Sequence, residues 1–302
     1  MISLSLRGLL PAMLLCLASA GAACSKAAAS TDDGQMAATT DTANMNKDTI
    51  PADTSSVTVK VETTAGTFTI LLYGDTPKHR DNFVKLVNEG YYDSTLFHRV
   101  IDQFMVQAGD PDSRTAAPGQ RLGSGGPGYT VEAEISMPRH FHKRYALAAA
   151  RQGAQVNPER RSSGSQFYIV TGRKLIPAQL EQLKMQLHNQ QLQATFNGLA
   201  AAHMQEIRDM QAARDSVGLK RLQDQLIAQP EAEVAAHPLS VTPEMEQAYT
   251  TVGGAPHLDG AYTVFGEVIS GTDVIDRIEQ AQTDGADRPV DDIRIISMSV
   301  VK

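Results

Sequence analysis

The chain has 302 residues, of which 42% are hydrophobic and 20% are charged, a composition typical of a soluble globular protein with one large domain or two ordinary ones. The formal net charge is −7 at pH 7. Binding to a phosphate backbone needs clustered Lys and Arg, so we expect no nucleic-acid partner.

Residues 1–24 have the layout of a secretory signal, with Arg7 near the start, an apolar run from Leu9 to Leu17, and small residues after it. The apolar run is too short to span a bilayer. Both cysteines of the chain, Cys16 and Cys24, lie in this segment. Cys24 resembles the lipid-acceptor cysteine of a bacterial lipoprotein, although this chain has glycine where that pattern usually has an aliphatic residue. Ordinary cleavage that leaves a free protein is the alternative.

Residues 25–56 are rich in Ala, Thr, Asp and Ser and contain few large apolar residues, a composition that cannot bury enough surface to fold. We expect a disordered tether here, or a leader of no consequence. Together with the signal it predicts a protein of the cell envelope, lipid-anchored to a bacterial membrane and facing the periplasm, or else soluble in the periplasm or secreted. The mature chain would have no disulfide, so its stability has to come from a core.

Order is predicted to begin at Val57. Apolar and polar residues alternate over 57–61 and again over 68–72, which predicts a β-hairpin with one buried face. Thr76 resembles the N-cap of a helix that begins at a proline, and Gly90 resembles its C-cap. Further predicted elements are strands over 95–100, 105–108, 145–150, 165–171, 262–268 and 292–301, and a helix over 273–280. Many short strands with two flanking helices favour a closed barrel, in a mainly β fold, over a doubly wound sheet.

From residue 176 to residue 249 the strand pattern gives way to helical spacing, with leucines at steps of three and four residues and Gln, Lys and Glu between them. Thr242, followed by proline, predicts one more short helix, which ends before Gly253. We therefore expect a helical hairpin or small bundle, inserted over 174–252 into a domain that spans 57–302.

Two roles are consistent with this insert. It could be a surface elaboration that serves only its own packing. It could instead contact a partner or a client protein, and Met185, Met204 and Met210 would then supply adaptable apolar surface.

Two other motifs suggest chemistry that their contexts do not support. The glycine-rich stretch 119–128 lacks the GK[ST] ending of a phosphate-binding loop and is not set between a strand and a helix, so we interpret it as turns and as a place of close approach to a bound peptide. His140 and His142 have no cysteine or acidic set converging on them, so we expect no metal site. Ser/His/Asp and Cys/His arrangements are not recognisable, and we expect no cofactor.

The stretch 97–111, FHRVIDQFMVQAGDP, contains the residues that could form a site. If residues 105–107 are extended, Met105 and Gln107 share a face, and Arg99 comes from the neighbouring segment. An apolar wall, an amide and a guanidinium can bind and polarise an apolar group but cannot easily cut it. His98 is interpreted as a structural hydrogen-bonding residue rather than as an acid or base.

This stretch resembles the core motif of the cyclophilin peptidyl-prolyl isomerases, and GSQFYIVTG and HLDGAYTVFGEV resemble two companion motifs of that family in the expected order. The resemblance covers 57–173 and 254–302, and a helical insert at this place resembles that of secreted bacterial relatives. It implies an eight-stranded antiparallel barrel capped by two helices that isomerises X-Pro bonds. The implied partners are proline-containing segments of unfolded or exported proteins. We expect a monomer that contacts the membrane only through its lipid anchor.

The resemblance also assigns site residues by position. Arg99 falls on the catalytic arginine of the family, and Gln107 on a glutamine that contacts the substrate backbone and steadies the arginine. The remaining substrate-binding positions are the proline-pocket walls Phe104, Met105 and Leu258, the next pair of site residues Gln166 and Tyr168, the peptide-flanking Ala150 and Arg151, Gly123 of the glycine loop, and His257 and Tyr262. By alternation, Phe167 should face the core instead.

Three of these positions depart from the family. Tyr168 stands where many relatives have phenylalanine, and its hydroxyl needs water or a partner. His257 stands where the eukaryotic archetype has a tryptophan that grips cyclosporin, and Tyr262 replaces a site histidine. The alternative function is a proline-peptide-binding or chaperone module whose insert holds clients.

Overall fold

The computed structural model describes residues 55–236 and 241–301. The expected signal, the lipid acceptor Cys24 and the tether up to residue 54 lie outside the described residues. The described chain divides into two compact units, one formed by 55–187 and 241–301 and the other by 188–236. None of the helices in these ranges is long and apolar enough to cross a membrane.

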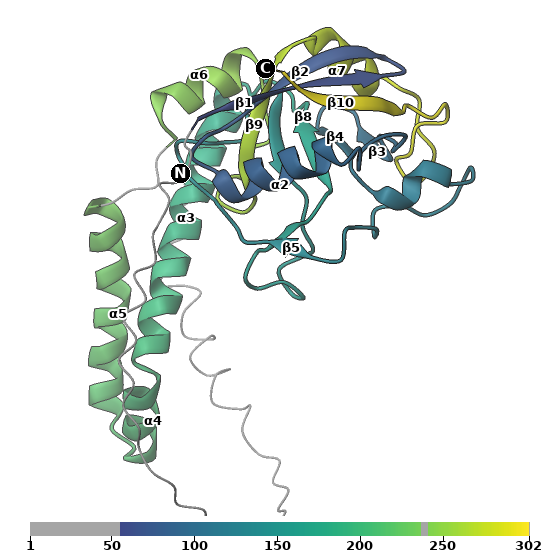
Figure 1. Ribbon diagram of the computed structural model, residues 1–302. Coiled ribbons are helices and arrows are strands. Elements are labelled where there is room, and N and C mark those ends of the chain that lie inside the picture. Colours follow the sequence, from purple (N-terminus) through teal and green to yellow (C-terminus); the bar gives the residue numbers. More distant parts are fainter. Residues whose placement is uncertain (1–54, 237–240, 302) are drawn as a thin grey trace, which may run out of the picture. The chain divides into compact units, whose positions relative to one another are not determined.

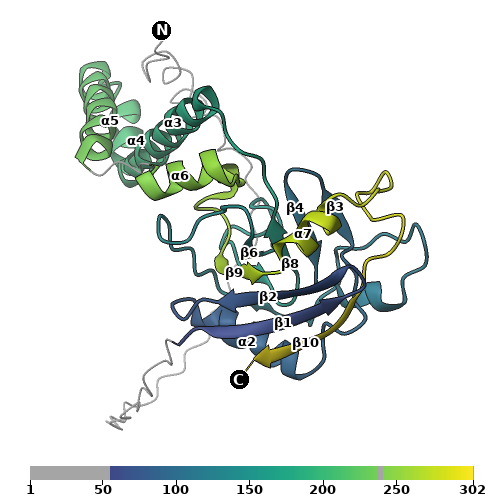
Figure 2. The ribbon, with the colours of Figure 1, turned by 90° about the horizontal axis from the view of Figure 1, so that it is seen from above.

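A curled antiparallel sheet of eight strands forms the larger unit, in the order β10-β1-β2-β9-β6-β8-β4-β3. Figure 2 shows β10, β1 and β2 side by side. The strands are β1 (Val57–Thr63), β2 (Gly66–Leu72), β3 (Arg99–Ile101), β4 (Met105–Ala108), β6 (Ala146–Ala149), β8 (Phe167–Val170), β9 (Val264–Ser270) and β10 (Ile295–Val301). A separate two-stranded sheet pairs β5 (Thr130–Val131) with β7 (Ser162–Ser163), and the sequence did not predict these two strands.

The alternating pattern of the first hairpin places its apolar residues inside the curled sheet. Val59 and Val61 of β1 face the core together with Phe68 and Ile70 of β2, all fully or almost fully buried. Two helices, α2 (Pro77–Asn88) and α7 (Thr272–Glu279), pack onto the same core and lie on opposite sides of the strands (Figure 1). The predicted hairpin and both flanking helices are confirmed.

The expectation of a closed barrel is wrong, because the ladder ends at β3 on one side and at β10 on the other. The strand predicted over 95–100 is regular only from Arg99, where β3 begins, and Ser94 just before the predicted strand has a left-handed φ of 66°. Residues 94–97 still lie beside 293–295. The Ser94 N–H donates to the Ile295 carbonyl at 2.8 Å, so irregular hydrogen bonds bridge the gap where a regular ladder would close a barrel.

The N-terminus of α2 is capped by a residue distant in sequence. Thr76, the predicted N-cap, makes no capping bond, and its hydroxyl donates to the Tyr73 carbonyl. Glu134 takes its place: its carboxylate accepts from the backbone N–H groups of Lys78 and His79 at 3.0 and 2.9 Å, and it contacts His79 Nδ1 at 2.7 Å. A carboxylate satisfies free N–H groups and the helix dipole better than a hydroxyl does.

We expect Glu134→Ala to destabilise the larger unit by about 1–2 kcal/mol, the loss of a cap and of a buried hydrogen bond. Burial by itself raises the pKa of Glu134, but the hydrogen bonds from His79 and Lys78 outweigh it and hold the pKa below the usual value. A lowered folded-state pKa stabilises the fold above the unfolded value of about 4.3, and this contribution disappears as the pH falls through the folded value.

Urea unfolding at pH 7 and at pH 3 would check this prediction, because the difference between wild type and variant should shrink at the lower pH. Glu132→Ala is the matched control: Glu132 also contacts Lys78, but its side chain is 63% exposed, so no measurable loss is expected. Equal losses in the two variants would contradict the capping role of Glu134.

Four helices follow β8: α3 (Pro177–Ala202), α4 (Met204–Ala212), α5 (Ser216–Ala236) and α6 (Pro243–Thr251). The smaller unit packs the second half of α3 against α4 and α5 through Phe196, Ile207 and Leu226. Met210 packs against this cluster, Met204 is half-buried and Met185 is exposed. The Thr242 hydroxyl accepts from the Met245 N–H at 3.2 Å, which confirms the predicted start of the last of these helices.

The first turns of α3 and all of α6 belong to the larger unit. Leu180 and Leu183 of α3 pack with Met245 and Tyr249 of α6 and with Phe141. The chain leaves the sheet at Gly172 and returns at Gly254, and the two glycines touch: a Cβ on Gly172 would lie 2.0 Å from the Gly254 carbonyl oxygen. The two ends of the segment between Gly172 and Gly254 are therefore held together.

Candidate active site

The strand register aligns three candidate positions, and Ala148 beside them, in one row across the sheet. Arg99 lies opposite Gln107, Gln107 opposite Tyr168, and Tyr168 opposite Ala148. Residues directly opposite each other share a face, so these side chains leave the sheet on the same side. Phe167 lies on the other side in the core, as alternation predicted.

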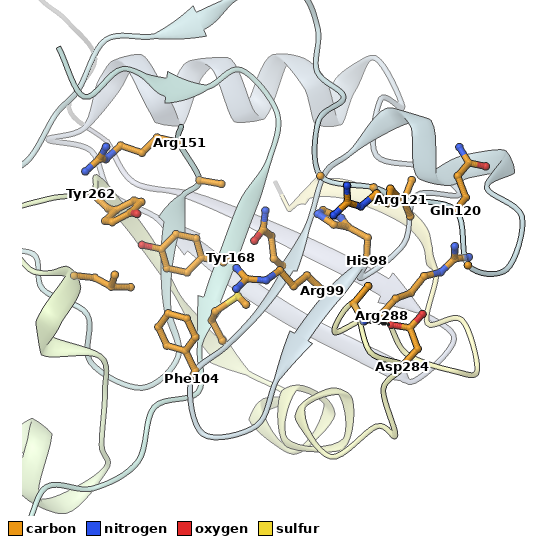
Figure 3. Close-up of a pocket in the computed structure, with 18 residues that line it drawn as sticks. His98, Arg99, Phe104, Gln120, Arg121, Arg151, Tyr168, Tyr262, Asp284 and Arg288 are labelled. Carbon is orange, nitrogen blue, oxygen red and sulfur yellow. Dashed lines mark hydrogen bonds between the residues drawn. The ribbon is translucent and has the colours of Figure 1, made fainter. Parts of the chain in front are cut away.

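A cavity of about 490 Å³ lies over this row. In Figure 3 the side chains of Arg99, Phe104 and Tyr168 point toward a common space. Ten of the predicted site residues line it: Arg99, Phe104, Met105, Gln107, Gly123, Ala150, Arg151, Tyr168, Leu258 and Tyr262.

One end of the cavity is apolar. Met105 is 2% exposed, and Phe104 and Leu258 pack beside it on a cluster that includes Ala148 and Val264. The small residues leave room above them, while the larger side chains enclose that room. A compact saturated ring fits such a surface by burial of apolar area alone.

Arg99 supplies the positive charge at the edge of the apolar surface. Its Nε donates to Asp287 Oδ2 at 3.4 Å, a weak contact between two side chains that are each more than 40% exposed. Such a surface ion pair contributes little to the stability of the fold and is easily broken. Within the described ranges the other guanidinium N–H groups have no acceptor, so they can donate to a bound molecule.

Gln107 and Gln166 form a short chain of amides. Gln107 Nε2 donates to Gln166 Oε1 at 3.0 Å, and Gln166 Nε2 donates to the Gly125 carbonyl at 2.7 Å. Gln107 is thus held by Gln166, and its expected role of steadying Arg99, which lies opposite it, stays a prediction. Gln166 does not line the first cavity, but it lines an adjoining groove of about 820 Å³ that shares Gln107, Gly123, Ala150 and Arg151 with it.

The peptide-flanking positions differ in what they can offer. The Ala150 N–H donates to the Gln166 carbonyl, and the Ala150 carbonyl accepts from the Ser163 N–H, so this backbone unit is already engaged. The Arg151 guanidinium stacks over the Tyr262 ring at 4.5 Å and donates to the Ala261 carbonyl. The Arg151 backbone has no hydrogen bond within the described part of the chain, so it can pair with a bound peptide.

His257 lies outside the cavity. Its ring packs against the far side of Phe104, with centroids 5.2 Å apart, and lines a second cavity of about 550 Å³ that also includes Arg173 and Gly254. Burial lowers the pKa of this histidine. Phe104 therefore separates His257 from the group of residues around Arg99.

His98 lines the cavity, although sequence reasoning interpreted it as a structural hydrogen-bonding residue. It is 4% exposed, and neither ring nitrogen has a hydrogen-bond partner among the described residues. Burial lowers its pKa, which favours the neutral ring beside Arg99. In the sequence, only its position next to Arg99 in the motif could have indicated that His98 lines the cavity.

Asp110 organises the glycine loop and was missed by the sequence analysis. Its fully buried carboxylate accepts from the backbone N–H groups of Asp112, Gly123 and Gly125. A carboxylate at the centre of the loop repels phosphate, which agrees with our interpretation of this stretch. The sequence feature that could have drawn attention to Asp110 is the Asp-Pro pair, because Asp110 also caps the short 3-10 helix η2 (Pro111–Thr115).

The two histidines of the 140–142 stretch contact different groups. His140 Nε2 contacts Asp75 Oδ1 at 2.7 Å and stacks on Tyr73, whereas His142 is buried against Asp259. They do not converge on one point. Among the residues that the structure describes, no group of three or more His, Cys, Asp or Glu is arranged to hold a metal ion.

Comparison with known proteins gives a consistent result. The sequence model of the family described as Cyclophilin type peptidyl-prolyl cis-trans isomerase/CLD matches residues 58–195 and 240–300. Peptidyl-prolyl cis-trans isomerase B of Bacillus subtilis is 43% identical over 89 residues, and a peptidyl-prolyl cis-trans isomerase of Helicobacter pylori is 36% identical over 99 residues. These matches cover 30% and 33% of this chain, and the chain spans about half (52%) of each relative.

A crystal structure of a Cryptosporidium parvum cyclophilin type isomerase aligns with 82% of this chain and 99% of its own, at 20% identity and a TM-score of 0.49. The family model alone matches well over half of the 302 residues and includes every residue of the cavity. The chain therefore belongs to the cyclophilin type peptidyl-prolyl cis-trans isomerase family.

Proposed function

We propose that the protein accelerates cis/trans isomerisation of X-Pro bonds, with no covalent step and no cofactor. The observation that carries the proposal is the placement of a guanidinium with free N–H groups, Arg99, at the edge of the apolar surface formed by Phe104, Met105 and Leu258. A proline ring fits the apolar surface, and its amide would then lie next to Arg99.

The chemistry follows from the electronic structure of the amide. Rotation about the C–N bond has a barrier of about 18–20 kcal/mol because that bond has partial double-bond character. A hydrogen bond from Arg99 toward the prolyl nitrogen localises its lone pair, weakens the partial double bond and lowers the barrier. No bond is broken, so neither a nucleophile nor a proton acceptor is required.

The other residues would hold the substrate around the rotating bond. The proline ring is gripped by Met105, Phe104 and Leu258, while the Gln107 carboxamide and the free Arg151 backbone hold the peptide on the side of the adjoining groove. With one side fixed, thermal motion turns the other side through the weakened bond. Positioning of this kind adds to the electrostatic effect of Arg99.

The test is an exchange measurement on an Ala-Pro peptide with the full chain, because uncatalysed X-Pro bonds relax in about 10–100 s. We expect micromolar protein to bring the exchange below one second. Exchange at the uncatalysed rate would refute the activity.

We further propose that the clients are exported proteins and that Cys24 is lipidated. The support is the signal-like segment and the cysteine at its end, both in the sequence alone. Replacing Cys24 with alanine should move the protein from the membrane fraction to the soluble fraction of the producing bacterium. An unchanged membrane pool would remove the case for this anchor.

A second candidate function, client holding by the part of the insert that forms the smaller unit, is suggested by exposed apolar side chains such as Val217. Leu187 and Val241 lie in one cluster, so a short Gly-Ser linker can replace 188–239. This variant should keep peptide isomerisation. If it also stops suppressing the aggregation of an unfolded client, client holding is supported; unchanged suppression counts against it.

A further inference from the structure

The wall of the cavity formed by Tyr168 is tied to a buried chain of polar side chains. Tyr168 is 4% exposed, and its hydroxyl lies 3.0 Å from His142 Nε2. His142 Nδ1 lies 2.8 Å from Asp259 Oδ1, and Asp259 Oδ2 accepts a hydrogen bond from the Tyr249 hydroxyl. The hydroxyl that distinguishes Tyr168 from the phenylalanine of many relatives therefore has a partner inside the protein.

The donor and acceptor chemistry of these groups fixes the direction of the hydrogen bonds to Asp259. A carboxylate only accepts, so both the Tyr249 hydroxyl and His142 Nδ1–H must donate to Asp259. Burial raises the pKa of Tyr168 and of Tyr249, so both phenols keep their protons. In the tautomer that carries its single proton on Nδ1, His142 presents Nε2 as an acceptor to the Tyr168 hydroxyl. Every polar atom of the chain is then satisfied without water.

The member of this hydrogen-bonded series that is farthest from Tyr168 along the series comes from the insert. Tyr249 belongs to α6, where it is fully buried with Leu180, Leu183 and Met245. The Phe141 ring, next to His142 in sequence, packs edge-on against the Tyr249 ring at 5.6 Å. The packing between the first turns of α3 and α6 thus fixes where the Tyr249 hydroxyl meets Asp259.

Asp259 directly follows the cavity residue Leu258 in the sequence. Its side chain is fully buried, and it also accepts from the His142 backbone N–H at 2.9 Å. On the cavity side, the Tyr262 ring packs edge-on against Tyr168 at 5.9 Å and against His142 at 6.3 Å. Displacement of Asp259 would therefore move His142 and, through it, the cavity wall formed by Tyr168.

We infer that Tyr249 is a positioning residue of the proline cavity, acting through Asp259 and His142 on the ring of Tyr168. This inference rests on the proposed isomerase function, because it concerns how the cavity holds proline. It also assigns part of the insert a role in the site: the stem formed by α6 supports a cavity wall, whereas residues 188–236 form their own unit.

The experiment is a double-mutant cycle on the full chain with a proline peptide. Tyr249→Phe should lower kcat/KM about 3- to 10-fold, the effect of one lost buried hydrogen bond, and mostly through a higher KM. In the Tyr168→Phe background the hydroxyl that receives the positioning is absent. There Tyr249→Phe should change kcat/KM less than about 1.5-fold, while its effect on the urea midpoint persists.

Met245→Leu is the matched control. It alters the same helix and the same buried cluster but leaves the hydrogen-bond chain intact, so kcat/KM should stay at the wild-type value. An unchanged kcat/KM in Tyr249→Phe would overturn the inference. So would an equal loss in both backgrounds, since that loss would not pass through the Tyr168 hydroxyl.

A spectroscopic measurement separates this inference from the activity itself. The ¹⁵N signals of His142 should show a protonated Nδ1 and an accepting Nε2 in wild type, and the Nε2 signal should shift in Tyr249→Phe. A wild-type protein without isomerase activity would refute the proposed function. A proton found on Nε2 in an active wild-type protein would instead refute the positioning chain.

Discussion

Replacement of Arg99 by alanine should lower kcat/KM for a proline peptide about 100- to 1,000-fold, the usual effect of removing one donor aimed at the reacting group. The other cavity residues would still hold the peptide, because the apolar surface of Phe104, Met105 and Leu258 does not depend on Arg99. We therefore expect the loss mainly in kcat. Nuclear magnetic resonance exchange rates at saturating peptide would measure it.

Two further variants make this result interpretable. Arg99→Lys keeps the charge but loses the planar set of donors, so it should recover only part of the rate. Arg277→Ala removes the same charge from an exposed helix position and should leave the rate unchanged. If Arg99→Ala were as active as wild type, Arg99 would have no role in the chemical step.

The largest effect on stability is expected from Gly109→Ala, which should destabilise the larger unit by roughly 2–5 kcal/mol. Gly109 has a left-handed φ of 90°, and a Cβ there would lie 2.3 Å from the Ser165 backbone carbonyl oxygen. The ends of β4 and β8 would have to move apart. The hydrogen bond from the Ser165 hydroxyl to the Gly109 carbonyl would be strained as well.

Gly119→Ala separates the two causes of this effect. Gly119 also has a left-handed φ, 76°, but a Cβ there meets nothing within 4 Å, so only the conformational cost of about 1–2 kcal/mol remains. All eight tyrosines lie outside 188–236 and the chain has no tryptophan, so tyrosine fluorescence during urea unfolding reports on the larger unit. Equal midpoint shifts in the two variants would contradict the close approach at Gly109.

The parts of the fold set by local periodicity could be predicted from the sequence. Alternation placed Val59 and Phe68 in the core and separated Gln107 from Val106, because side-chain direction in a strand depends only on neighbours along the chain. The opening between β3 and β10 could not be predicted in this way. It lies between two segments far apart in the sequence, 94–97 and 293–295, and no local pattern indicates that their hydrogen bonds are irregular.

Site residues within the motifs could be placed for the same reason, whereas their supports could not. The contact of Tyr168 with His142 spans 26 residues, and that of His142 with Asp259 spans 117, so no spacing along the chain indicates either one. Asp287, the partner of Arg99, is 188 residues away. His257 was included by its position in a motif, yet the ring of Phe104 separates it from the cavity.

The contact between Gly172 and Gly254 has a consequence for how this protein can change over evolutionary time. Where two ends of an excursion are already held together, the sheet gains or loses almost nothing when the connecting segment grows, since the entropic cost of a longer loop rises only with the logarithm of its length. Changes in the length of residues 188–239 should therefore cost the larger unit little stability. If Tyr249 positions the cavity wall as we infer, selection on the cavity would extend to the short stem that carries Tyr249.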